Sequence, residues 1–216
     1  MQLRTAFSAL ALTALMFSGS LFAQAAAEPF QEGVHYQLIQ PAQPTANADK
    51  VEVVEVFGYT CPHCANFQPH MDSWLERQGD DVDFSRIPVV FSPAWEPFAR
   101  AYYTALALNV LDQSHGALFD ALHKQRKPLR SPEDLATFFT EFGVSEEDFL
   151  KTTKSFAVNT RVTRGTTTAQ RYGVTGTPSM VINGRYLTTG RMAGSMQKVI
   201  QVTDYLIAKE SAAMAN

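Results

Sequence analysis

The feature that most constrains the fold is a pair of cysteines in the segment Cys61-Pro62-His63-Cys64, and the chain has no others. The apolar run from Val51 to Phe57 precedes the pair and predicts a buried β-strand. The segment from Ala65 to Arg77 predicts a helix. The pair therefore lies where a strand ends and a helix begins, with a spacing that brings two thiols within disulfide range.

The predicted position of Cys61 at a helix N-terminus indicates unusual thiol chemistry. Backbone N–H groups lack partners there and the helix dipole favours negative charge, so the thiol is pushed toward the thiolate. A disulfide from Cys61 to Cys64 closes almost no loop, which makes a structural staple a weak explanation. A zinc site needs about four ligands, and only His63 lies nearby. The pair therefore favours redox chemistry over a metal site or an inert disulfide.

Residues 1–25 have the features of a cleaved secretory signal peptide. Arg4 gives the first residues a positive charge, residues 6–17 are apolar, and Ala23-Gln24-Ala25 fits a signal-peptidase site. The alternative is an N-terminal membrane anchor, but the apolar core is short for a span. We therefore expect cleavage and an exported, soluble mature chain.

The charge balance argues against nucleic acid as a partner. The net charge of −3 becomes −4 once Arg4 is removed, which is mildly acidic. The basic run from His123 to Lys127 fits a solvated helix C-terminus better than a nucleic-acid patch. His115 and His123 show no metal-ligand spacing, so we expect them on the surface or hydrogen-bonded in the core.

The pattern around the cysteines predicts β structure on both sides of a helical block. An edge strand over 35–39 and a strand over 82–87 precede the block, and the latter completes a β-α-β unit with the cysteine helix. A strand ending at Ile182, the turn Asn183-Gly184 and a return strand over 185–188 follow it. The helices are expected over 97–111, 117–127, from 132 to 142, from 146 toward 172, and finally over 195–209.

Glu55 is an unusual residue within the first buried strand. It shares a face with Val53 and Phe57 and lies near the carboxyl end of the strand, where the cysteine pair follows. A buried carboxylate beside a thiol pair could relay protons. The alternative is a glutamate that reaches solvent past the strand edge.

A strand leads to Cys-Pro-His-Cys and its helix, and a helical block follows. After the block, Val174-Thr175-Gly176-Thr177-Pro178 precedes a hairpin and a last helix. This order resembles the thioredoxin superfamily. More narrowly, it is similar to the DsbA family of periplasmic disulfide oxidases, over essentially the whole mature chain. The resemblance implies a thioredoxin-like α/β fold, with a central mixed β-sheet flanked by helices and an inserted all-helical subdomain. The implied division is a signal peptide (1–25), a first thioredoxin-like part (26–95), the helical insertion (96–165) and a second thioredoxin-like part (166–216).

The resemblance also implies the site residues. Cys61 would be the exposed attacking sulfur and Cys64 the buried sulfur that resolves a mixed disulfide, while His63 helps to stabilise the Cys61 thiolate. Many members of the family carry Val at the position of Thr177, whereas Thr also occurs there in isomerases and reductases of the superfamily. The catalytic residues carried over are Cys61, Pro62, His63, Cys64, the buried acid Glu55, and Thr177-Pro178 of the cis-proline loop.

The implied function is a thiol:disulfide oxidase that donates its Cys61–Cys64 disulfide to newly exported, unfolded proteins in the periplasm. A membrane quinone-linked oxidase of the DsbB type would reoxidise it, and the disulfide itself replaces an organic or metal cofactor. We expect a monomer. One alternative is an isomerase or reductase on the same fold, which the redox equilibrium with glutathione would distinguish. Another is a binding module for unfolded chains, which would stay active after both cysteines are replaced by serine.

Overall fold

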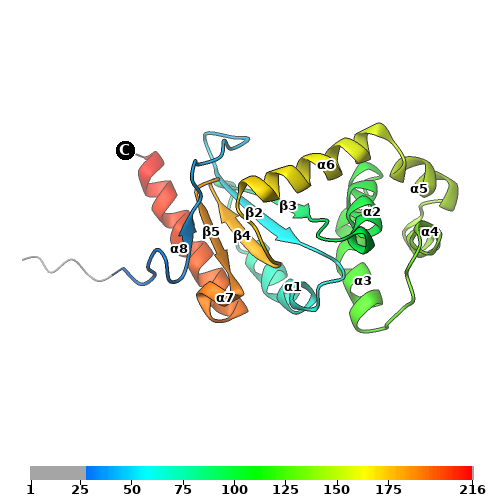
Figure 1. Ribbon diagram of the computed structural model, residues 1–216, viewed down its shortest axis with the longest axis horizontal. Helices are drawn as coiled ribbons and strands as arrows, with labels where there is room; N and C mark the ends of the chain where they lie inside the picture. The colour runs from blue at the N-terminus through cyan, green and yellow to red at the C-terminus, as the bar shows by residue number, and fades with distance from the viewer. Residues whose placement is uncertain (1–27, 216) are drawn as a thin grey trace, which may run out of the picture.

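The computed structural model describes residues 28–215, so the predicted signal peptide lies outside the described residues. A five-stranded sheet carries helices on both faces, and a block of helices extends from one end of it (Figure 1). The predicted mixed sheet with flanking helices and a helical block is confirmed. In residues 28–215, we find no helix with the length and apolar character needed to cross a bilayer.

The sheet has the strand order β1-β5-β4-β2-β3. Its strands are β1 (Gln37–Leu38), β2 (Val51–Phe57), β3 (Val82–Pro88), β4 (Ser179–Ile182) and β5 (Tyr186–Thr189). β2 pairs in parallel with β3, and the other neighbours are antiparallel. The expected β-α-β unit is therefore present, with α1 (Pro62–Leu75) as its crossover helix.

The helices after β3 divide into the helical block and the helices that cover the sheet. The block contains α2 (Glu96–Ala107), α3 (Leu111–His123), α4 (Pro132–Phe139) and α5 (Glu146–Thr153), with short 3₁₀ turns at Pro93–Trp95 and Thr140–Phe142. α6 (Phe156–Arg171) leads back from the block to the sheet (Figure 1). α7 (Gly190–Ala193) and α8 (Met196–Met214) follow the last strand.

The buried strand β2 directs alternate side chains to two different cores, as a strand must. Val53 packs with Trp74 of α1 and Leu206 of α8 on one face of the sheet. Val54 packs with Ala169 of α6 on the other face. All seven residues of β2 are buried, which explains why its sequence is apolar on both faces.

A third core joins the helical block to the end of β2. Phe57 packs there with Leu118 and Phe119 of α3 and with both cysteines. The cysteine pair therefore lies where the sheet, α1 and the helical block meet.

The helix boundaries inside the block differ from the prediction of one helix over 97–111 and another over 117–127. α2 ends at Ala107, since Asn109 adopts a left-handed conformation (φ 56°) and the N–H of Val110 bonds back to the carbonyl of Ala105 at 3.0 Å. Leu111 instead begins α3, which ends at His123. The capped starts at Ser131 and Ser145 are confirmed by side-chain bonds to the N–H groups of α4 and α5.

The predicted turn at Asn183-Gly184 is confirmed, with positive φ at both residues (50° and 60°). The return strand begins one residue later than expected, because Tyr186 rather than Arg185 lies opposite Ile182. β4 begins only at Ser179, since residues 173–178 form a loop. Residue 165, the expected boundary after the helical insertion, lies inside α6, and the domain division itself stays a prediction.

Candidate active site

Cys61 is the N-cap residue of α1, directly after the end of β2. Its backbone is extended (φ −84°, ψ 116°), and its carbonyl accepts the N–H groups of Cys64 and Ala65, each at 3.1 Å. Pro62 occupies the start of the helix, where its missing N–H costs no hydrogen bond and its fixed φ suits the first turn. The first cysteine therefore lies at the helix N-terminus, where the sequence predicted it.

Both cysteines are free thiols and both are largely buried. Cys64 is 1% exposed, as expected, but Cys61 is only 8% exposed, so the prediction of an exposed Cys61 is wrong. The reason is the loop that precedes β4, because the carbonyl of Thr177 lies 3.5 Å from the Cys61 sulfur and accepts a hydrogen bond from it when the thiol is protonated. Cys61 is still the more accessible of the two.

The two thiols have opposite electrostatic environments. The pKa of Cys61 is lowered to about 5, mainly by a hydrogen bond from the Cys64 thiol. Burial opposes this shift, while the side chain of Thr177 and the backbone N–H groups of Cys64 and His63 add to it. Burial raises the pKa of Cys64 far above that of an ordinary thiol. At neutral pH, reduced Cys61 is therefore a thiolate and Cys64 a thiol.

The loop before β4 brings a distant segment to the thiols. The Thr177–Pro178 peptide bond is cis, as the family resemblance implied. Ser179 holds the loop by donating its hydroxyl to the carbonyl of Gly176 at 2.7 Å. Thr177 and Pro178, which lie more than 100 residues after Cys61 in the chain, thus form one wall of the site.

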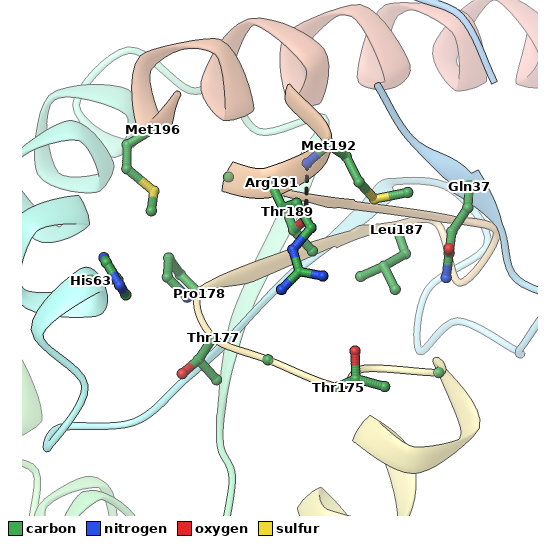
Figure 2. Close-up of a pocket in the computed structure, with 13 residues that line it drawn as sticks. Gln37, His63, Thr175, Thr177, Pro178, Leu187, Thr189, Arg191, Met192 and Met196 are labelled. Atoms are coloured by element: carbon green, nitrogen blue, oxygen red, sulfur yellow. Dashed lines mark hydrogen bonds between the residues drawn. The ribbon is translucent and has the colours of Figure 1, made fainter. Parts of the chain in front are cut away.

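A pocket of about 520 Å³ opens beside this loop (Figure 2). Figure 2 shows His63 of α1 at one end, Gln37 at the other, and the loop with Thr177 and Pro178 between them. The side chain of His63 is exposed at this end, while its backbone N–H acts on Cys61. A contribution of the His63 imidazole to the thiolate stays a prediction.

Glu55 is buried (1% exposed) and does not reach solvent past the strand edge. Its carboxylate accepts a 2.8 Å hydrogen bond from Arg86, which lies directly opposite it in the parallel pairing of β2 with β3. Burial raises the pKa of Glu55, and the guanidinium of Arg86 opposes that rise. Glu55 lies on the face of β2 that α1 covers, since its neighbours Val53 and Phe57 pack there. Its role as a proton relay stays a prediction.

The sequence interpretation missed a polar contact that holds the segment before Cys61. The hydroxyl of Tyr59 lies 2.7 Å from Nδ1 of His115, and both residues are buried. His123, at the other end of α3, donates from Nε2 to the carbonyl of Tyr59 at 2.6 Å. Two histidines of one helix therefore flank a residue two positions before Cys61. Their spacing of eight, about two helical turns, was the only sequence signal.

Gly58 was also missed, and its role is a close approach. A Cβ atom at this position would lie 2.1 Å from the ring of Trp95, so no larger residue fits while the indole stays in place. Trp95 belongs to the turn before α2, so this contact again joins the helical block to the segment that leads to Cys61.

In the part of the chain that the structure describes, no group of three or more His, Cys, Asp or Glu side chains could hold a metal ion. The arrangement instead supports thiol chemistry: a thiolate at a helix N-terminus, a protonated partner below it, and an open pocket beside it.

Comparisons with known proteins agree with this geometry. Residues 52–201 match the family model of the DsbA-like thioredoxin domain. The thiol:disulfide interchange protein DsbA of Pseudomonas syringae pv. tomato is 39% identical over 206 residues, which cover 94% of this chain and 96% of that protein. DsbA of Pseudomonas aeruginosa is 38% identical over 205 residues, which cover 94% and 97% of the two chains.

Solved structures are similar as well. The crystal structure of Pseudomonas aeruginosa DsbA superposes with a TM-score of 0.83 at 37% identity and covers 88% of this chain and 99% of that one. The oxidoreductase DsbA from Xylella fastidiosa gives a TM-score of 0.80 at 40% identity, with coverage of 86% and 99%. The chain therefore belongs to the DsbA family and is a thiol:disulfide oxidoreductase of the kind that acts through a redox-active disulfide.

Proposed function

We propose that this protein oxidises newly exported proteins by transferring to them a disulfide between Cys61 and Cys64. The observation that carries the proposal is the contrast between the two thiols, a pKa of about 5 for Cys61 and a strongly raised pKa for Cys64. A thiol of low pKa is a good leaving group, while its buried partner stays protonated and unreactive toward solvent.

The proposed cycle starts from the oxidised protein. A substrate thiolate attacks the sulfur of Cys61, so that a bond from the substrate to Cys61 forms, the Cys61–Cys64 bond breaks, and Cys64 takes up a proton. A second substrate thiolate then attacks the first substrate sulfur, and Cys61 leaves as a thiolate. The substrate gains a disulfide and loses two electrons, which remain on the reduced cysteine pair.

The thiolate of reduced Cys61 favours this direction. Its pKa falls from 9.0 to about 5, and each unit is worth about 1.4 kcal/mol, or about 30 mV for a two-electron couple. At pH 7 an ordinary thiol is protonated, so only about two of these units, those between pH 7 and the lowered pKa, stabilise the reduced protein. They make the disulfide about 60 mV more oxidising. This contribution supports an oxidase rather than a reductase, and the threonine at position 177 does not oppose it, since its side chain also lowers the Cys61 pKa.

We assign the proton transfer at Cys64 to Glu55. Cys64 must gain a proton when the mixed disulfide forms and lose it again during reoxidation. Glu55 is a buried carboxyl with a raised pKa on the face of β2 that α1 covers, and Arg86 compensates its charge when it ionises. Pro62, His63, Thr177 and Pro178 are proposed to shape the thiolate site and the adjacent surface on which substrate lies.

The remaining parts of the proposal follow from the family and from the N-terminal sequence. Residues 1–25 would direct export to the periplasm and be removed there. A membrane quinone-linked oxidase of the DsbB type would take the two electrons from reduced Cys61 and Cys64. The protein would act as a monomer and need no cofactor besides its disulfide.

The redox equilibrium with glutathione tests the proposal. We expect the cysteine pair to be reduced by glutathione far more readily than the disulfide of an unfolded peptide with the same Cys-Pro-His-Cys sequence. The variant with Cys61→Ser and Cys64→Ser should lose all oxidation of dithiol peptides, whereas a pure binding module would keep its effect on unfolded chains. A pair as hard to reduce as the peptide disulfide would contradict the oxidase.

A further inference from the structure

The pocket beside the thiolate site has a positive charge that the proposed reaction does not use. Arg191 of α7 points into it, between the Pro178 loop and the residues of β5 (Figure 2). Arg191 is an exposed residue, and it forms no ion pair or side-chain hydrogen bond with any residue in 28–215. Several other arginines do face a carboxylate: Arg77, Arg86, Arg100 and Arg185.

The pocket offers this arginine no partner of opposite charge. Among the described residues that line the pocket, none is Asp or Glu, and the other basic side chain is His63. The protein as a whole is acidic, with a net charge of −3. A positive pocket therefore lies beside the reactive sulfur of a negatively charged protein, which favours a negatively charged ligand there.

The turn that carries Arg191 is held in place. Thr189 caps α7 by accepting the N–H of Met192 at 3.3 Å (Figure 2). The backbone of Gly190 packs so closely on Met196 of α8 that a Cβ atom would lie 2.9 Å from its terminal methyl group. The guanidinium is thus presented from a fixed backbone, which reduces the entropy lost when it binds a partner.

The rest of the lining suits an extended peptide with varied side chains. Leu187, Met192 and Met196 supply apolar surface, and methionine adapts to different partners. Thr175 and Gln37 supply polar groups at the far end. A volume of about 520 Å³ has room for a few side chains but not for a folded domain.

We propose that Arg191 gives this oxidase a preference for substrate segments that carry an aspartate or glutamate within a few residues of the reacting cysteine. A guanidinium binds a carboxylate through two parallel N–H···O bonds, which lysine and glutamine cannot reproduce. The pocket adjoins Thr177, whose carbonyl contacts the Cys61 sulfur, so a segment held at Cys61 passes this arginine. The inference rests on the proposed oxidase function and specifies which substrates it takes.

Competition among three dithiol peptides tests this preference. The peptides are identical except for a Glu, Gln or Lys placed on either side of the first cysteine, and kcat/KM for oxidation is measured for each. The unmodified protein should oxidise the Glu peptide about tenfold faster than the Lys peptide at low salt, and the ratio should shrink at high salt. The ratio between peptides is the readout, because it cancels any change in the intrinsic rate of a variant.

Three variants make the test specific. Arg191→Gln should bring the ratio of the Glu-peptide rate to the Lys-peptide rate close to one, and Arg191→Glu should invert it. Lys198→Gln is the control, because it removes the same charge from an exposed site outside the pocket and should leave the ratio unchanged. An unaltered ratio in Arg191→Gln, or an equal loss in Lys198→Gln, would overturn the inference. If no variant and not even the unmodified protein oxidises any peptide, the proposed oxidase function has failed instead.

Discussion

Reduction of the Cys61–Cys64 disulfide is expected to stabilise the folded protein at neutral pH, whereas the loss of a disulfide usually destabilises a fold. The folded N-terminus of α1 lowers the pKa of Cys61 from 9.0 to about 5, and the unfolded chain has no such site. Because the folded pKa is the lower one, the added stability is complete above the unfolded pKa of 9.0 and is lost as the pH falls through about 5.

The size of this effect follows from the two pKa values. The Cys61 thiolate stabilises the reduced fold by about 0.4 kcal/mol at pH 5, about 2.7 kcal/mol at pH 7 and about 4 kcal/mol at pH 8. Cys64 adds nothing to the pH dependence of stability over these pH values, because burial keeps it a thiol. The cross-link stabilises the oxidised fold by at most about 2 kcal/mol for so short a loop, whatever the pH. The reduced protein should therefore be the more stable by about 0.7 kcal/mol at pH 7, with the order reversing below about pH 6.5.

Urea unfolding of the oxidised and reduced protein at a series of pH values measures this difference. The reduced-minus-oxidised free energy of unfolding should rise by more than about 3 kcal/mol between pH 5 and 8. The Cys61→Ser variant is the control, since it cannot form the thiolate and its stability should lack this component. A difference that stays constant over the same pH range would mean that Cys61 is an ordinary thiol, and the reasoning would be refuted.

Three further changes test the surroundings of the thiols. Glu55→Gln should slow the proton-coupled steps at Cys64 without unfolding the protein, and unchanged oxidation and reduction rates over about pH 5 to 8 would exclude the relay. His63→Ser should raise the pKa of Cys61, measured by thiolate absorbance, while an unmoved titration would assign the effect to the helix terminus alone. Tyr59→Phe removes a buried hydroxyl that lies 2.7 Å from Nδ1 of His115 and should lower the free energy of unfolding by about 1 to 2 kcal/mol. An unchanged free energy of unfolding would mean that this contact does not stabilise the fold.

The sequence alone determined those parts of the protein whose causes lie within a few residues. β2 is apolar apart from Glu52 and Glu55 and is followed by Cys61 and Pro62, so the strand, the helix start and the spacing of the two sulfurs could all be predicted. The turn at Asn183-Gly184 follows from two residues that tolerate positive φ. The family resemblance then supplied the cis peptide at Pro178, which no local pattern near that residue requires.

The tertiary structure decided how distant segments meet at the site. Cys61 is covered because a loop more than 100 residues away places Thr177 against its sulfur. Glu55 has a charged partner because the register of β2 and β3 sets Arg86 opposite it. These contacts depend on strand register and on the docking of loops, which the whole chain determines through its packing, so no short pattern around Cys61 or Glu55 could encode them.

The same reason explains the residues that sequence interpretation missed. His115 and His123 became part of the site because α3 docks against the end of β2 and places both around Tyr59. Arg191 faces the pocket because the turn after β5 folds against α8. The reactive motif is thus a local property of the chain, whereas the surfaces and polar groups around it exist only once the sheet and the helical block have packed together.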